Sequence, residues 1–193
     1  IQWSFAPMID IARDPRWGRI VESNGEDPTL GGAMAAGHVR GFQGDFGPES
    51  ILAGPKHFAG YGAARGGRDY DDSDISDSEL RNVYLPPFKA AVDAGAANIM
   101  SAYMDLNGVP ASGNRWLLTD VLRGEWGFDG LIVSDYGAVE ELAKIHHVAA
   151  DNQGAARLAL AAGVDCELPD GVAYRTLVDQ VKALQHVVDE PVR

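Results

Sequence analysis

The sequence predicts an α/β protein in which parallel strands alternate with helices. Short apolar runs rich in β-branched residues alternate along the chain with longer segments of helical periodicity. The apolar runs are hydrophobic almost throughout rather than at every second residue, which indicates a parallel sheet covered by helices on both faces. These observations leave a (β/α)8 barrel and an open sheet as the candidate architectures.

The first half of the chain contains two strand candidates, each followed by a helix candidate. Residues 3–11 and 51–58 are short and apolar, and residues 30–41 and 79–94 carry helical periodicity. The segment "SDSE", which ends at Glu79, fits a capping box at the start of the second helix.

Two adjacent prolines, Pro86 and Pro87, fall inside the second helix candidate. Proline cannot donate the backbone hydrogen bond of a helix, and its ring clashes with the preceding turn. We therefore expect two helical pieces between residues 79 and 94.

The second half repeats the same alternation with three further strand candidates. Glycines in "DAGA" and "AAGV" stand where a helix gives way to a strand. The helix between residues 139 and 162 is expected to break near Asp151. The expected strands are 97–103, 131–134 and 164–167, and the expected helices are 117–125, 139–162 and 173–188.

Composition excludes several classes of function. The 193 residues are 46% hydrophobic and 23% charged, as in one soluble globular domain. The net charge is −12 and the 16 basic residues are scattered, which argues against a nucleic-acid partner. The single cysteine, Cys166, excludes an internal disulfide, and we expect it in the core. No apolar stretch approaches the ~20 residues of a transmembrane helix, so no membrane partner is expected.

Polar side chains follow three consecutive strand candidates, at the carboxyl edge where α/β proteins concentrate function. Because these side chains would meet at one edge, we expect a shared pocket. A strand-end carboxylate among basic and aromatic groups suits carbohydrate chemistry, since it can attack or stabilise an oxocarbenium-like carbon while aromatic rings cover sugar faces. The residues at these strand ends are Lys56, His57, Tyr103, Asp105, Asp135 and Tyr136.

Several long motifs together resemble the catalytic barrel of glycoside hydrolase family 3, and its β-glucosidase branch most closely. They are "SFAPMIDIARDPRWGR", "GEDP", "KHFAGYG", "YLPPFKAAVDAGAANIMSAYMDLNGVPAS" and "LLTDVLRGEWGFDGLIVSDYGA", and they cover nearly the whole chain in order. The resemblance implies a TIM-barrel-like (β/α)8 fold. It also implies a retaining β-glycosidase that hydrolyses terminal β-D-glucosyl residues and needs no cofactor.

The resemblance assigns roles to individual residues. Asp135 of "SDY" takes the place of the catalytic nucleophile. Lys56 and His57 of "KHF" match a pair that hydrogen-bonds the hydroxyls of the non-reducing sugar, and Arg19 of "WGR" matches a third such contact.

Three further positions carry weaker assignments by resemblance. Tyr103 matches a tyrosine near the nucleophile, and Tyr136 takes a position at the edge of the sugar site, although either could be plain packing. Arg16 of the same "RWGR" motif is expected to be structural.

The chain departs from the family pattern in ways that matter. After Phe58 it has no histidine of the kind that the N-acetylglucosaminidase branch uses, which favours the β-glucosidase branch. In that branch the acid/base is a glutamate of a following α/β sandwich domain, which we expect to lie outside this sequence. Residues 1–193 are thus expected to be a partial barrel of about five βα units, short of the ~250 residues of a complete barrel. Its open edges predict self-association.

The remaining motifs do not indicate a metal site or a phosphate site. We expect the His146–His147 pair on a solvated helix face rather than in a metal site. The acidic run at residues 68–79 lacks the glycine and the ligand spacing of an EF-hand, so we expect a solvated loop that leads into the capping box. Residues 64–67 lack phosphate-loop spacing, so we expect a flexible loop there.

Alternatives to a glucosidase remain open at this point. One is a non-catalytic sugar-binding or structural fragment, and another is an unrelated parallel α/β enzyme. β-Glucosidase and β-xylosidase are not distinguished, and a periplasmic or secreted location is suggested by the resemblance alone.

Overall fold

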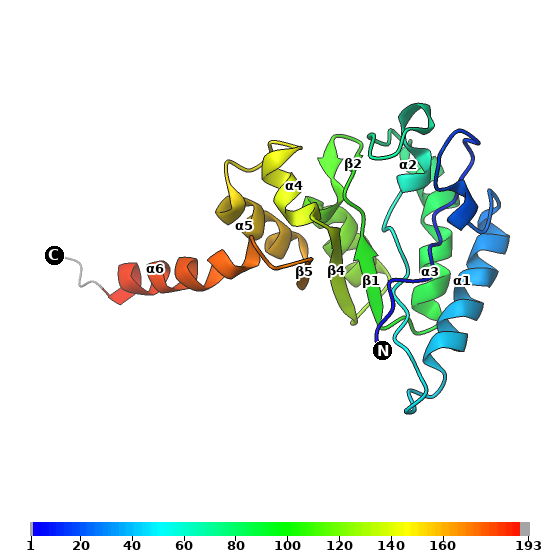
Figure 1. The fold of residues 1–193 in the computed structure, drawn as a ribbon, viewed down its shortest axis with the longest axis horizontal. Helices are drawn as coiled ribbons and strands as arrows, with labels where there is room; N and C mark the ends of the chain where they lie inside the picture. The colour runs from blue at the N-terminus through cyan, green and yellow to red at the C-terminus, as the bar shows by residue number, and fades with distance from the viewer. Residues whose placement is uncertain (1, 190–193) are drawn as a thin grey trace.

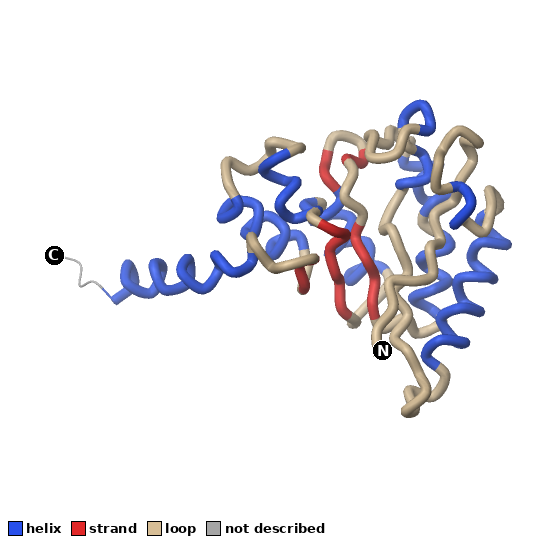
Figure 2. Tube along the Cα trace, viewed as in Figure 1, coloured by secondary structure: helices blue, strands red, loops and turns tan. Residues whose placement is uncertain are grey.

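The computed structural model describes residues 2–189, with side chains described to residue 183. Its centre is a three-stranded parallel sheet in the order β1-β4-β5, formed by β1 (Asn98–Ser101), β4 (Leu131–Tyr136) and β5 (Cys166–Leu168) (Figures 1 and 2). β1 and β4 pair in continuous register from Asn98↔Leu131 to Ser101↔Ser134. The three strands predicted for the second half of the chain are confirmed, with ends that differ by a few residues.

The two strands predicted in the first half are extended but are not regular strands. Residues 3–11 and 51–58 run parallel to each other and to β1 through isolated bridges, which include Met8↔Lys56 and Phe58↔Ser101. Figure 2 shows them as loop beside the sheet. Pro7 and Pro55 lie within these segments, and a proline cannot donate to a strand ladder, so continuous pairing is interrupted.

Two helices cover one side of this parallel array. α1 (Pro28–Gln43) is capped by Asp27, whose carboxylate accepts a hydrogen bond from Leu30 N. It packs against α3 (Pro86–Asp93), as Figure 1 shows. α3 begins at Pro86, where the missing N–H lies in the first turn and needs no helical partner.

The expected interruption at the prolines is confirmed. The capping residue Ser76 accepts a hydrogen bond from Glu79 N and starts the short α2 (Asp77–Glu79). A π-helical segment, Leu80–Tyr84, then leads into α3.

The helices of the second half follow the predicted pattern. A π-helical segment, Trp116–Glu125, precedes β4. The predicted break near Asp151 separates α4 (Ala138–Lys144) from α5 (Asn152–Ala162), and the Asp151 side chain caps α5 at Gly154 N. α6 (Leu177–Asp189) extends away from the rest of the molecule (Figure 1).

The remaining elements are short. The strands β2 (Asp105–Leu106) and β3 (Val109–Pro110) form an antiparallel pair. The 3-10 turns are Ile20–Glu22, Tyr61–Ala63, Arg65–Gly67, Ala111–Gly113 and Tyr174–Thr176.

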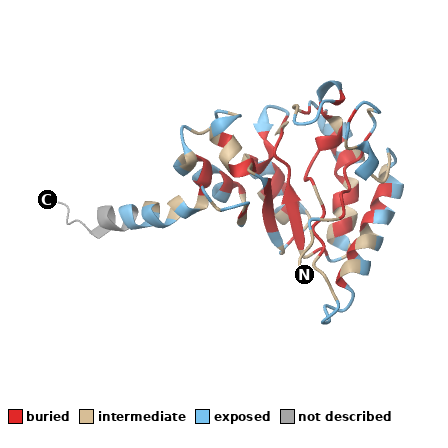
Figure 3. Ribbon diagram, in the orientation of Figure 1, coloured by how far each residue is buried: buried red, intermediate tan, exposed pale blue. Residues whose placement is uncertain are grey.

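The core lies on both sides of the sheet, as the continuous apolar runs predicted. Side chains of β1 and β4 such as Ile99, Ile132 and Val133 are fully buried, and Figure 3 shows burial concentrated along these strands and the inner helix faces. The loops that follow the strands gather at one edge, with β2, α2 and α4 at the top of Figure 1. Among residues 2–189, no helix is long and apolar enough to cross a membrane.

Candidate active site

The structure brings the side chains that follow different strands together at the carboxyl edge. His57 lies next to the end of the segment 51–58, Asp135 lies near the end of β4, and Tyr103 follows β1. The imidazole Nε2 of His57 lies 3.6 Å from Asp135 Oδ2, and the rings of His57 and Tyr103 are 6.4 Å apart. These three predicted residues therefore share one buried cluster.

Asp135 is a buried carboxylate with one uncommitted oxygen. Asp135 is 9% exposed, and its Oδ1 accepts a 2.7 Å hydrogen bond from Tyr136 N. Its Oδ2 has no hydrogen-bond partner among the described residues. A carboxylate held through one oxygen has the other available for a reacting centre.

The electrostatics of Asp135 are set mainly by burial. Desolvation raises the pKa of the Asp135 carboxyl above its ordinary value of 3.8. His57, the hydrogen bond from Tyr136 N, and the charges of Lys56 and Arg19 act in the opposite direction without cancelling that effect.

This raised pKa predicts that Asp135→Asn stabilises the folded protein. When the folded pKa exceeds the unfolded one, the folded state holds the proton more tightly, so stability falls as pH rises through the folded pKa. At pH 7 the ionised Asp135 therefore destabilises the fold, and the neutral asparagine removes that cost. Thermal denaturation should give a higher Tm for Asp135→Asn at pH 7, with the difference shrinking as pH falls toward 3.8. An equal or lower Tm at pH 7 would contradict this.

His57 is fixed by a residue that the sequence reasoning missed. Asp10 Oδ2 lies 2.8 Å from His57 Nδ1 and accepts a 2.9 Å hydrogen bond from His57 N. Both residues are almost completely buried. The available signal was a charged residue inside the apolar run "FAPMIDIA".

Arg19 and Lys56 were both predicted to contact the sugar, but they differ in whether their charged groups are already hydrogen-bonded. Arg19 is half-buried, donates 2.7 Å and 2.9 Å hydrogen bonds to Glu22, and lies over the Tyr61 ring. The hydrogen bond to Glu22 raises the pKa of Arg19, whereas burial acts against it. Lys56 is half-buried and makes no side-chain hydrogen bond within the described part of the chain, and its charge reaches both Asp135 and Glu22.

Tyr103 belongs to a chain of hydrogen-bonded aromatic residues. Its hydroxyl contacts the hydroxyl of Tyr61, which donates to Asp69. Tyr70 stacks on the Tyr103 ring with 4.9 Å between centroids. Burial raises the pKa of both Tyr61 and Tyr103, so both phenols keep their protons at neutral pH.

The acidic run at residues 68–79 is not simply a solvated loop, which corrects that expectation. Asp69 accepts hydrogen bonds from Tyr61 and, at 3.1 Å, from Trp17 Nε1. It thus bonds to Tyr61, whose hydroxyl contacts Tyr103 and whose ring packs against His57.

Tyr136 lies outside the buried cluster. Its residue surface is 72% exposed although it directly follows Asp135. Arg16 is exposed, and its guanidinium pairs with Asp14 in the same loop rather than with Asp135 or His57.

Three further expectations need correction. His146 lies beyond the end of α4 rather than on its face, and its Nε2 is 2.8 Å from the Tyr103 carbonyl oxygen. Asp105 does not join the cluster, because its Oδ1 accepts a 2.6 Å hydrogen bond from Gly108 N in the β2–β3 turn. Cys166 is half-buried in β5 rather than a core residue.

A second acidic side chain lies on α4, the helix that follows Asp135. Glu141 of α4 is half-buried, and desolvation raises the pKa of its carboxyl. His146 acts against that rise, and the charge of Asp135 adds to it. Within residues 2–183, no group of three or more His, Cys, Asp or Glu side chains is arranged to hold a metal ion.

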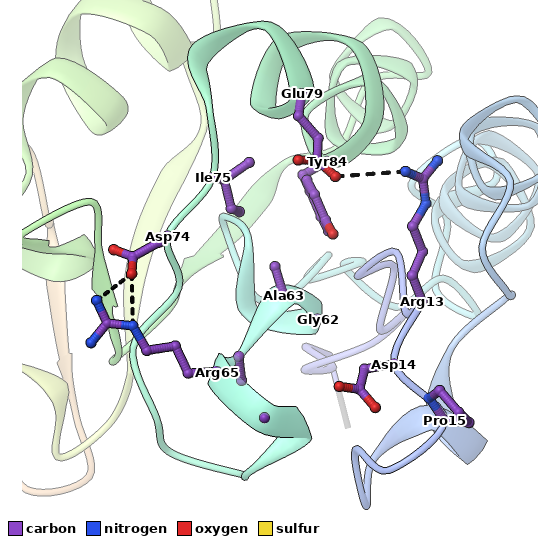
Figure 4. Close-up of a pocket in the computed structure, with 12 residues that line it drawn as sticks. Arg13, Asp14, Pro15, Gly62, Ala63, Arg65, Asp74, Ile75, Glu79 and Tyr84 are labelled. Carbon is purple, nitrogen blue, oxygen red and sulfur yellow. Dashed lines mark hydrogen bonds and ion pairs between the residues drawn. The ribbon is translucent and has the colours of Figure 1, made fainter.

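A separate cavity of about 550 Å³ opens beside this cluster, and neither Asp135 nor His57 lines it. Figure 4 shows Arg13 and Glu79 paired across its upper side and Arg65 paired with Asp74 at its edge. It lies between the 13–15 loop, the 62–66 turn and α2. The cavity is therefore distinct from the Asp135 site.

Comparisons with known proteins agree on one family. The model of the glycosyl hydrolase family 3 N terminal domain matches residues 1–192. A periplasmic beta-glucosidase of Salmonella typhimurium is 46% identical over 185 residues, which is 95% of this chain and 24% of the relative. A beta-xylosidase of Formosa agariphila is 46% identical over 86% of this chain and 24% of its own length.

Solved structures give the same result. A β-glucosidase from Erythrobacter marinus superposes with a TM-score of 0.92 at 43% identity, covering 94% of this chain and 25% of that chain. A β-glucosidase from Listeria innocua in complex with glucose has a TM-score of 0.90 at 42% identity, covering 95% and 26%. The chain thus spans about a quarter of the length of the proteins that it matches.

Proposed function

Because this chain belongs to glycoside hydrolase family 3 and has the α/β fold of its N-terminal barrel domain, we propose that it is part of a retaining β-glycosidase of the β-glucosidase type. Residues 1–193 would form one partial barrel domain of that enzyme. The observation that carries the proposal is the buried Asp135, which keeps one carboxylate oxygen free beside His57.

Asp135 is the nucleophile in this proposal. Its free Oδ2 attacks the anomeric carbon of the sugar, a C–O bond forms to the enzyme, and the bond to the leaving oxygen breaks. Water then cleaves the glycosyl-enzyme ester and restores the carboxylate. At neutral pH the reaction requires ionised Asp135, and the nearby charges of Lys56 and Arg19 favour that form against the effect of burial.

The general acid is proposed to come from outside this chain. Retaining hydrolysis needs a second carboxyl group ~5–5.5 Å from the nucleophile, which protonates the leaving oxygen and then activates water. The family resemblance assigns that role to a glutamate of a following α/β sandwich domain.

Lys56, His57 and Arg19 are proposed to bind sugar hydroxyls. Lys56 has an uncommitted ammonium group, and His57 directs Nε2 toward Asp135. Arg19 is already paired with Glu22, so it would offer only the guanidinium N–H groups that this pair leaves free. The glucose complex of the Listeria innocua relative supports a sugar as the ligand.

Alanine at each of these three positions should weaken glucose binding by roughly 10-fold to 100-fold, because hydrogen bonds to charged groups are worth ~1.5–3 kcal/mol. The measurement is competitive inhibition by glucose in the full-length enzyme. Arg16→Ala is the matched control for Arg19→Ala, because Arg16 is exposed and pairs with Asp14. Unchanged inhibition in all three variants would contradict the assignment.

A β-xylosidase is the second candidate function, favoured by the Formosa agariphila relative at the same 46% identity. Hydrolysis of aryl β-glucoside and aryl β-xyloside by the full-length enzyme tests the two. We expect a higher kcat/KM for the glucoside. A higher kcat/KM for the xyloside would favour the β-xylosidase assignment instead.

A periplasmic or secreted location is also proposed, supported by the name of the Salmonella typhimurium relative. Cell fractionation of the native organism tests it, and activity confined to the cytoplasm would contradict it.

A further inference from the structure

We propose that Asp10 is a positioning residue that fixes the ring orientation and the tautomer of His57, so that Nε2 faces Asp135 and the bound sugar. The role of His57 in that statement rests on the proposed function. The position of the proton on the His57 ring can be tested without it.

The geometry couples Asp10 to both parts of His57. The same oxygen, Asp10 Oδ2, lies 2.9 Å from the His57 backbone nitrogen and 2.8 Å from the ring Nδ1. Asp10 is 2% exposed and His57 is 1% exposed, so water does not compete for these bonds. One carboxylate therefore fixes the backbone and the side chain of His57 together.

This contact determines which ring nitrogen carries the proton. A carboxylate oxygen is an acceptor, so Nδ1 must be the donor in a 2.8 Å bond. Nε2 is then the ring nitrogen left for the active site, 3.6 Å from Asp135 Oδ2. That separation is too long for a direct hydrogen bond, so Nε2 remains available to a ligand hydroxyl.

The aromatic neighbours of His57 cannot perform this selection. Tyr61 and Tyr103 meet the imidazole ring edge to face, at centroid distances of 5.2 Å and 6.4 Å. Such packing accepts a ring rotated by 180° about χ2, which exchanges nitrogen and carbon positions. Asp10, at 2.8 Å from Nδ1, is the hydrogen-bonded partner that distinguishes the two orientations, because Asp135 Oδ2 lies beyond hydrogen-bond distance of Nε2.

A purely structural role explains Asp10 poorly. It lies between Ile9 and Ile11 in a buried apolar segment, and its Oδ1 has no hydrogen-bond partner among the described residues. A buried carboxylate with an unpaired oxygen costs stability relative to a well-packed apolar side chain. The two hydrogen bonds to His57 offset this loss of stability.

The first test is the tautomer of His57 in the unaltered full-length protein. Histidine-selective ¹⁵N NMR reports the protonation of each ring nitrogen, and His57→Gln identifies the signal. We expect a proton on Nδ1. A neutral ring with its proton on Nε2 alone would overturn the proposal, whatever the enzyme hydrolyses.

The second test is a double-mutant cycle in the full-length enzyme. Asp10→Ala should lower kcat/KM by about 10-fold to 100-fold, as the loss of the carboxylate that orients a metal-ligating histidine does. The same change in a His57→Ala background should cost almost nothing, because Asp10 acts through His57. An equal loss in both backgrounds would overturn the proposal by showing a role independent of His57.

Two further variants complete the test. Asp10→Asn keeps an oxygen acceptor and should recover part of the Ala loss, whereas equal losses in the two would overturn the proposal. Asp14→Asn, four residues further along the chain at a half-buried carboxylate that pairs with Arg16, should leave kcat/KM unchanged. If instead Asp135→Asn is fully active, the proposed function fails while the His57 tautomer can still be measured.

Discussion

Asp135→Asn in the full-length enzyme should lower kcat by about 10⁴-fold or more, as the loss of a nucleophile does in other covalent mechanisms. The asparagine amide keeps the size of the side chain and can still accept the hydrogen bond from Tyr136 N. It cannot attack the anomeric carbon, because it carries no negative charge. The expected rise in Tm at pH 7 would separate this loss from unfolding.

The matched control is Asp129→Asn. Asp129 is exposed and lies just before β4, whereas Asp135 lies near the carboxyl end of the same strand. The control makes the same chemical change and should keep full kcat. Full activity of Asp135→Asn would show that another residue is the nucleophile.

The 193-residue chain tested alone should not hydrolyse cellobiose at an enzymatic rate. Loss of the general acid removes about 10²–10⁴ of the rate when the leaving group is poor. The assay compares the purified wild-type chain with Asp135→Asn, so that activity from contaminating glucosidases appears in both and can be subtracted. We also expect the isolated chain to self-associate through its open strand edges, which size-exclusion chromatography would show.

Asp135-dependent turnover of cellobiose by the isolated chain would overturn this assignment of the acid. Glu141 would then be the first residue to test, because burial and the charge of Asp135 raise the pKa of its carboxyl and favour the protonated form. Glu140 is less suited, since it pairs with Lys144 at 2.9 Å. Asp105 is committed to Gly108 N in its turn. Glu141→Gln would distinguish these cases.

The strand and helix order could be predicted from sequence because local signals determine it. Continuous apolar runs placed β1, β4 and β5, and the proline pair placed the start of α3. The same reasoning assigned regular strands to residues 3–11 and 51–58, where the structure has extended segments with isolated bridges. The pairing is interrupted because both segments contain a proline, which cannot donate a backbone hydrogen bond to a neighbouring strand. The sequence does not show which strand lies beside each proline.

The candidate site could be predicted in part. Polar residues at strand ends are visible in sequence, and His57 and Asp135 do lie together. Asp10 was missed because it lies inside its apolar run and not at the strand end, where polar site residues were expected. Its partner His57 also lies 47 residues away in the sequence. Only the folded chain shows that a buried charge in one segment faces a histidine in the next.

The remaining site residues depend on long-range contacts in the same way. Asp69 sits in an acidic run that looks solvated, yet its carboxylate accepts from Tyr61 and Trp17. Pairing of Arg19 with Glu22 spans only three residues, but the sequence does not show that the ring of Tyr61 holds the guanidinium in place.

The central claim, that Asp135 is the nucleophile, is tested most directly by covalent labelling. A 2-fluoro-glycoside traps the glycosyl-enzyme intermediate in the full-length protein, because the fluorine slows hydrolysis of the ester. Peptide mass spectrometry locates the attached sugar. We predict the label on Asp135, within the peptide that contains β4, and none in Asp135→Asn. A label on any other carboxylate, or none in an active enzyme, would contradict the claim.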